Sequence, residues 1–120
     1  MSKTLLVVDD SSSVRQVVGM ALRGAGHKVI EAVDGRDALM KLDGRKIHLV
    51  VSDVNMPNMD GISFVKEMKT KPAYKFTPVL MLTTESQDAK KVEGKAAGAK
   101  AWLVKPFKPD VLLAAVAKLA

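Results

Sequence analysis

The sequence contains no cysteine, which excludes disulfide bridges and thiolate metal sites and suits a reducing compartment. Aromatic residues make up only 4% of the chain, too few for a platform on which nucleic-acid bases stack. No unbroken apolar run comes near the roughly 20 residues that a membrane-spanning helix needs. We therefore expect a soluble, cytoplasmic protein that binds neither nucleic acid nor a membrane.

The net charge of +6 would suit a nucleic-acid binder, but its distribution does not. Basic residues are scattered from Lys3 to Lys118, without a stripe along any one predicted helix. A scattered excess is typical of a solvated surface, or of one that favours an acidic partner. The length of 120 residues and the apolar content of 48% suit one domain with an ordinary core. We predict a single domain over residues 1–120.

Short apolar runs alternate with helical patterns along the chain. Runs this short, with few polar interruptions, are typical of strands buried on both faces of a parallel sheet. The predicted strands are 5–8, 29–30, 49–51, 79–82 and 102–104, and the predicted helices are 14–25, 35–42, 62–70, 87–97 and 110–119. This alternation implies βαβ crossovers. The predicted fold is therefore a single doubly wound α/β domain, a five-stranded parallel sheet flanked by five helices.

Two of these helices carry apolar stripes that predict their buried faces. The stripe of the first comprises Val14, Val17, Val18, Ala21, Leu22 and Ala25. The stripe of the last comprises Val111, Leu112, Ala115, Val116 and Leu119. We expect Ser12 or Ser13 to cap the first helix and Gly26 to end it in the left-handed conformation.

Polar side chains stand where the predicted strands end. They are Asp9 and Asp10 after the first strand, Asp53 and Asn55 after the third, Thr83 and Thr84 after the fourth, and Lys105 after the fifth. The carboxyl ends of strands in an open parallel sheet share one edge, so we expect these side chains to converge there. Each one alone is explained by a helix cap, a turn or a loop lysine. Their conjunction favours a functional site.

Three carboxylates at one edge repel one another unless a positive charge joins them. Hard oxygen ligands without histidine or cysteine favour Mg²⁺, or Mn²⁺, over Zn²⁺. A carboxylate beside such an ion can attack a phosphorus atom whose oxygens are neutralised by the metal, Lys105 and a threonine hydroxyl. The expected chemistry is phosphoryl transfer to a carboxylate.

Over its whole length the chain resembles the receiver family of bacterial response regulators. The matching motifs are 7–11 (VVDDS), 53–57 (DVNMP), 59–61 (MDG), 82–85 (LTTE) and 104–107 (VKPF). Segments 31–35, 74–78 and 93–99 are similar to the single-domain chemotaxis members of that family. The resemblance implies a flavodoxin-like sheet with the strand order 2-1-3-4-5.

The resemblance also implies roles for individual residues. Asp53 would be the phosphoacceptor, with Mg²⁺ held by side chains of Asp10 and Asp53, by the backbone carbonyl of Asn55 and, through a water, by Asp9. Thr83 and Lys105 would hold the phosphoryl oxygens. Asn55 and Glu85 would tune dephosphorylation. Such a protein is a signalling phosphoacceptor rather than an enzyme, although it promotes its own phosphorylation and dephosphorylation.

Output in this family is a population shift, in which the threonine moves inward and an aromatic residue of the fifth strand rotates. Here that residue is Trp102; the alternative is that its indole simply packs on the fourth helix. The expected partner face comprises Lys90, Lys91, Lys95, Trp102, Leu113 and Ala117. Leu113 and Ala117 lie off the predicted core stripe of the last helix.

The family implies several partners for a protein that we expect to be a monomer. They are a CheA-like histidine kinase as donor, a flagellar motor switch protein or another output protein as target, and a phosphatase. A receiver that acts as a phosphate sink, or that regulates a non-flagellar system, fits the sequence too.

Two other classes of protein share parts of this pattern. A phosphatase of the haloacid dehalogenase type needs a second carboxylate two residues after its nucleophile, where this chain has Asn55. A calcium-binding EF-hand starting at Asp53 would need glycine at its sixth position and glutamate at its twelfth, where this chain has Asn58 and Phe64. The phosphatase is disfavoured and the calcium module is rejected.

Overall fold

The computed structural model describes residues 3–84, 95, 97–105 and 107–120. The strands are β1 (Thr4–Val8), β2 (Lys28–Ala32), β3 (Leu49–Asp53), β4 (Val79–Thr84) and β5 (Ala101–Lys105). The helices are α1 (Ser12–Gly24), α2 (Gly35–Lys41), α3 (Gly61–Lys69) and α5 (Pro109–Leu119), with a short 3-10 helix η1 (Pro72–Tyr74). The fourth predicted helix, 87–97, lies outside the described residues except for Lys95 and Ala97.

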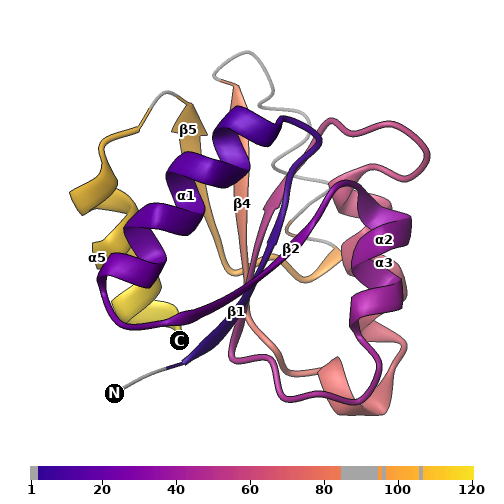
Figure 1. Cartoon of the computed structure of the whole chain (residues 1–120). Helices are drawn as coiled ribbons and strands as arrows, with labels where there is room; N and C mark the ends of the chain where they lie inside the picture. Colours follow the sequence, from indigo (N-terminus) through magenta and orange to yellow (C-terminus); the bar gives the residue numbers. More distant parts are fainter. Residues whose placement is uncertain (1–2, 85–94, 96, 106) are drawn as a thin grey trace.

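The five strands form one parallel sheet in the order β2-β1-β3-β4-β5, which confirms the predicted doubly wound α/β fold. Figure 1 shows α1 and α5 on one face of this sheet and α2 and α3 on the other. Parallel strands need crossover connections, and in the described part of the chain a helix follows each of β1, β2, β3 and β5. No helix in that part is long and apolar enough to cross a membrane.

Alternate residues of each strand supply two cores, one on each face of the sheet. Leu5 and Val7 pack with α1 and α5, and we call this cluster the α1/α5 core. Leu6 and Val8 pack with α2 and α3, in the α2/α3 core, where Phe64 is fully buried. Burial on both faces is confirmed for β1, β3 and β4. Most residues of β2 and β5 are only half-buried, because these strands form the two edges of the sheet.

The ends of the helices follow their local chemistry, with one correction. Ser11, not Ser12 or Ser13, caps α1: its backbone is extended and its hydroxyl accepts the N–H of Val14 at 3.3 Å. Ser12 and Ser13 already belong to the helix. Gly26 has a φ of 93°, as predicted for the residue that ends the helix in the left-handed region.

The predicted apolar stripes are wrong at three positions. Val17 is 59% exposed and Val111 is 45% exposed, although both were assigned to buried faces. Ala25, the residue that follows the last turn of α1, is exposed too. The helices α1 and α5 contact the sheet through Val18 and Leu112. Val17 and Val111 each stand one position earlier, about 100° away around the helix, so their side chains point away from the sheet.

The outer face of α5 differs from the prediction at one of its two residues. Leu113, expected off the core stripe, packs against the α1/α5 core. Ala117 is exposed, as expected. The apolar face that α5 turns to solvent therefore carries Val111 and Ala117, where the sequence predicted Leu113 and Ala117.

Candidate functional site

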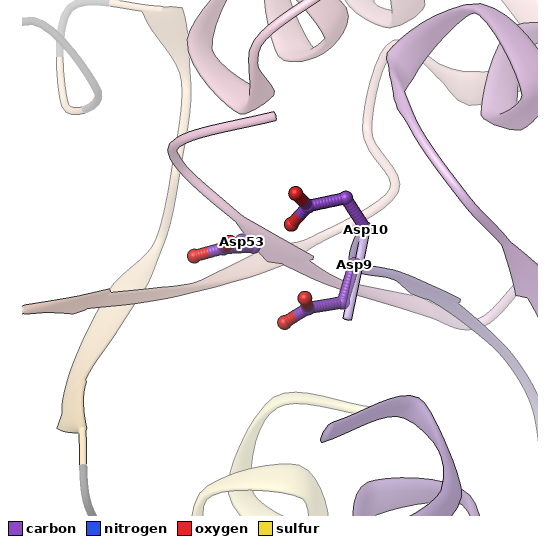
Figure 2. A group of neighbouring side chains, drawn as sticks. All are labelled: Asp9, Asp10 and Asp53. Atoms are coloured by element: carbon purple, nitrogen blue, oxygen red, sulfur yellow. The ribbon is translucent and has the colours of Figure 1, made fainter. Parts of the chain in front are cut away.

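Three carboxylates meet at the carboxyl-terminal edge of the sheet. Asp9 and Asp10 directly follow β1, and Asp53 is the last residue of the neighbouring strand β3. Each offers a carboxylate oxygen, and these three oxygens lie within 4.8 Å of one another. Figure 2 shows the three side chains pointing to the same side. Asp9 and Asp53 are buried and Asp10 is exposed, so the cluster opens to solvent on one side.

Lys105 joins this cluster from the far edge strand. Its Nζ lies 3.1 Å from Oδ1 of Asp53 and 3.2 Å from Oδ2 of Asp9. Three carboxylates and one ammonium group leave two negative charges at the cluster. A divalent cation with a preference for hard oxygen ligands would neutralise them, so the donor set fits Mg²⁺.

Asp9 is held in place by the first turn of α1 as well as by Lys105. Its Oδ1 accepts the N–H of Ser11 at 2.9 Å, and its backbone carbonyl accepts a hydrogen bond from the guanidinium of Arg15. Arg15 also lies 3.5 Å from Glu31 of β2. Sequence reasoning missed Arg15, because a lone arginine on a helix gives no sign of what its side chain reaches.

The carboxyl of Asp53 has a raised pKa in this cluster. Burial raises its pKa, and the negative charge of Asp9 raises it further, while Lys105 and the N–H of Val54 offset part of the effect. Burial alone would lower the pKa of Lys105, but Asp53 and Asp9 hold it above its usual range. Lys105 therefore stays an ammonium. Oδ1 of Asp53 also accepts the Val54 N–H at 2.9 Å, and within the described residues no hydrogen bond reaches Oδ2.

Two loops beside the cluster are pinned to each other by Asp34. This residue caps α2, accepting the N–H of Asp37 at 2.8 Å and the side-chain amide of Asn58 at 2.8 Å. These two hydrogen bonds hold the pKa of Asp34 below its usual range. Asn58 adopts a φ of 67°, which asparagine tolerates better than most residues. The loop after β3 is thereby fixed next to the loop after β2, although the sequence analysis assigned Asp34 and Asn58 no structural role.

Gly61 brings the start of α3 into direct contact with the backbone of Asp53. A Cβ atom at position 61 would lie 2.0 Å from the carbonyl oxygen of Asp53, and the Gly61 N–H donates to the Val54 carbonyl at 2.8 Å. Only glycine permits this approach. Gly61 belongs to the 59–61 (MDG) motif, but the motif alone does not show this packing requirement.

The other predicted site residues have different environments. Thr83 is fully buried in β4, one residue before the strand ends, and Asn55 is exposed in the loop after β3. Trp102 in β5 packs against the α2/α3 core, and within the described residues its Nε1 is buried without a hydrogen-bond partner. Lys95 is exposed. Glu85, Lys90 and Lys91 lie outside the described residues.

A hollow of about 470 Å³ reaches the cluster from the α1 side. It is lined by Val14, Val17 and Phe107, and also by Lys105. The side chain of Lys105 is 22% exposed. The side chain that contacts Asp53 is thus partly accessible from solvent.

Comparison with known proteins gives one consistent family. Residues 5–117 match the model of the response regulator receiver domain. The chain is similar to the structure of chemotaxis protein CheY4 of Vibrio cholerae, with a TM-score of 0.94, 49% identity and full coverage of both chains. It is 39% identical to chemotaxis protein CheY1 of Helicobacter pylori, over 90% of this chain and 89% of that protein. It is 35% identical to protein PilG of Pseudomonas aeruginosa, over 93% and 83% respectively.

Proposed function

This chain belongs to the response regulator receiver domain family, and from that premise we propose that it accepts a phosphoryl group on Asp53 from a phosphohistidine kinase in a magnesium-dependent reaction. The observation that carries the proposal is the meeting of Asp9, Asp10, Asp53 and Lys105 at one edge of the sheet. Residues 1–120 act as a single receiver domain in this proposal.

The donor set of the cluster supports a magnesium site. The side chains of Asp10 and Asp53 and the backbone carbonyl of Asn55 would hold the ion, with Asp9 contributing through a water. When bound, Mg²⁺, or Mn²⁺, supplies positive charge to the phosphoryl oxygens. The excess negative charge of the cluster and the raised pKa of Asp53 are the features that such an ion would relieve.

In the proposed transfer, a carboxylate oxygen of Asp53 attacks the phosphorus atom of the phosphohistidine. A phosphorus–oxygen bond forms and the phosphorus–nitrogen bond breaks, and the released imidazole takes a proton from solvent. Lys105 is close enough to move its ammonium from Asp53 to a phosphoryl oxygen, and the hydroxyl of Thr83 would hold a second one. Asn55 and Glu85 would flank the product and tune its hydrolysis.

Phosphorylation would then shift the protein between two states through Thr83 and Trp102. Among the described residues the buried indole N–H of Trp102 has no hydrogen-bond partner, which costs about 1–3 kcal/mol, so a second position in which it finds an acceptor or solvent is close in energy. The face that changes would carry Lys90, Lys91, Lys95, Trp102, Leu113 and Ala117.

The output partner is proposed to be the flagellar motor switch, as part of chemotaxis, with a CheA-like kinase as the donor and a phosphatase acting on the phosphorylated form. The similarity to CheY4 and CheY1 supports this choice. The alternative is a receiver that serves as a phosphate sink or regulates a non-flagellar system. A pull-down with motor switch proteins distinguishes the two alternatives. If the protein regulates the motor, the motor switch proteins retain it after acetyl phosphate treatment but do not retain the Asp53→Ala variant.

Labelling with radioactive acetyl phosphate tests the phosphoacceptor directly. The wild-type protein should be labelled in Mg²⁺ and not in EDTA, and Asp53→Asn should carry no label. Asp43→Asn is the matched control, since the same chemical change in an exposed loop should leave labelling intact. Label that persists on Asp53→Asn, or that forms without a divalent ion, would contradict the proposal.

A further inference from the structure

A second hollow, of about 790 Å³, lies at the opposite end of β1 and β2 from the carboxylates. Its floor is the stretch of β2 that contains Val29 and Ile30, with Val29 packed on the α1/α5 core and Ile30 on the α2/α3 core, on opposite faces of the sheet. Its cationic lining comes from the end of α1, from β2 and from the loop before β3: Arg23, Lys28, Arg45 and Lys46. The hollow therefore combines an apolar floor with a basic rim, and no residue of the proposed phosphorylation site lines it.

Much of the positive charge of this rim is not compensated. Arg23 is paired with Glu31 at 2.9 Å, and Arg45 with Asp43 at 2.8 Å. The Arg45 guanidinium lowers the pKa of Asp43 to about 2. Lys28 and Lys46 are exposed, and neither has an ion pair within the described part of the chain. Among the described residues, the ammonium groups of Lys28 and Lys46 thus have no carboxylate partner. The guanidinium groups of the two arginines are each already paired with one carboxylate.

The floor of the hollow also offers unpaired backbone, because β2 is an edge strand. The N–H of Lys28 donates to Lys3 and the carbonyl of Ala32 accepts from Asp9, so alternate residues from 28 to 32 face β1. Val29 and Glu31 consequently face outward. The Glu31 carbonyl accepts Nζ of Lys41 at 3.2 Å, but the backbone groups of Val29 have no partner among the described residues. The open stretch of the sheet edge coincides with the hollow.

We propose that this hollow binds an extended acidic peptide segment of a partner protein. The segment pairs its backbone with the N–H and carbonyl of Val29, lays an apolar side chain on Val29, and places carboxylates against Lys28 and Lys46. A small phosphate compound fits less well, because it uses neither the unpaired backbone nor the apolar floor. The binding does not depend on phosphorylation of Asp53.

Binding is tested with a fluorescent hexapeptide in which glutamate alternates with valine, followed by anisotropy and by amide hydrogen exchange. The peptide should bind the wild-type protein and slow exchange of the Val29 amide. Lys28→Glu combined with Lys46→Glu should weaken binding at least tenfold. The matched control, Lys66→Glu combined with Lys75→Glu, changes the net charge equally at exposed lysines outside the hollow and should weaken it less than threefold.

Two further probes separate strand pairing from simple charge attraction. Two versions of the peptide are made, one N-methylated at its odd-numbered residues and the other at its even-numbered residues, and both keep their charge. The version whose methylated residues face β2 cannot pair with it and should bind at least tenfold more weakly. Tripolyphosphate should compete poorly. The inference is overturned by equal losses in the two double variants, by unchanged exchange at Val29, by full binding of both methylated peptides, or by tripolyphosphate binding as tightly as the peptide. Acetyl phosphate labelling of the Lys28/Lys46 variant should equal that of wild type, which separates this test from that of Asp53.

Discussion

Replacing Gly61 with alanine tests how closely the start of α3 must approach Asp53. The new Cβ would lie 2.0 Å from the Asp53 carbonyl oxygen, 3.0 Å from its carbonyl carbon and 2.9 Å from Cε of Met81. Ordinary van der Waals contact begins near 3.4 Å, so the two backbones must separate by more than an ångström. The methionine can move aside, but the carbonyl of Asp53 belongs to a central strand.

Two effects of known size follow from this separation. Overpacking against backbone should destabilise the domain by about 3 kcal/mol, at the upper end of the usual range. For a domain of this length that corresponds to a fall of roughly 10 °C in the midpoint of thermal unfolding. Misplacing a reacting group by about 1 Å costs on the order of 100-fold in rate, so labelling of Asp53 by acetyl phosphate should slow by that factor.

Gly24→Ala is the matched control. Gly24 is the last residue of α1, and apart from its chain neighbours and the backbone of its own helix, no heavy atom of the described residues lies within 4 Å of the place that an alanine methyl group would take there. Alanine should therefore leave stability unchanged or raise it by about 0.5–1 kcal/mol. Thermal unfolding by circular dichroism and labelling at a temperature where both variants are folded give the two readouts. A Gly61→Ala protein with the wild-type midpoint and the wild-type labelling rate would show that α3 does not need this close approach to Asp53.

Three further predictions concern stability and the metal. Because the pKa of Asp53 is raised above 3.8, its protonated form stabilises the fold below that value, and this contribution is lost as the pH rises through the raised pKa. Asp53→Asn should therefore raise the unfolding midpoint in EDTA at neutral pH, by less as the pH falls toward 4; a lower midpoint would contradict this sign. Tyr74→Phe removes a hydroxyl that donates to the Arg45 carbonyl at 2.7 Å and accepts the Gly44 N–H at 3.0 Å. It should cost about 1–3 kcal/mol in urea unfolding with labelling intact; loss of labelling in the folded variant would be unexpected. Millimolar Mg²⁺ should change the fluorescence of Trp102, the single tryptophan, because it lies three residues before Lys105 on the same strand; an unchanged spectrum would count against the metal site or the placement of the indole.

The order and type of the elements are local properties, and the sequence predicted them. Short apolar runs predict buried strands rather than solvent-exposed helices. Amphipathic helices between these strands connect one parallel strand to the next, and this alternation predicts the doubly wound sheet. The same logic placed Asp9, Asp53 and Lys105 at strand ends. Position along the chain was enough here, because all strands of a parallel sheet end at the same edge.

Local chemistry also left several choices open. Three successive serines can each cap a helix, and only the backbone geometry selects Ser11 over Ser12 and Ser13. An apolar stripe about a third of a turn wide does not say which residue faces the sheet, so Val17 and Val111 were assigned wrongly.

The contacts that build the site were decided by tertiary structure alone. Strand order places β1 beside β3, and only that neighbourhood lets Lys105 reach Asp9 across 96 positions and lets Asn58 bond Asp34 across 24. The steric need for glycine at position 61 likewise arises from the backbone of Asp53, which belongs to another element. A sequence specifies propensities of neighbouring residues, whereas proximity between distant ones exists only once both cores have packed and closed the loops between them.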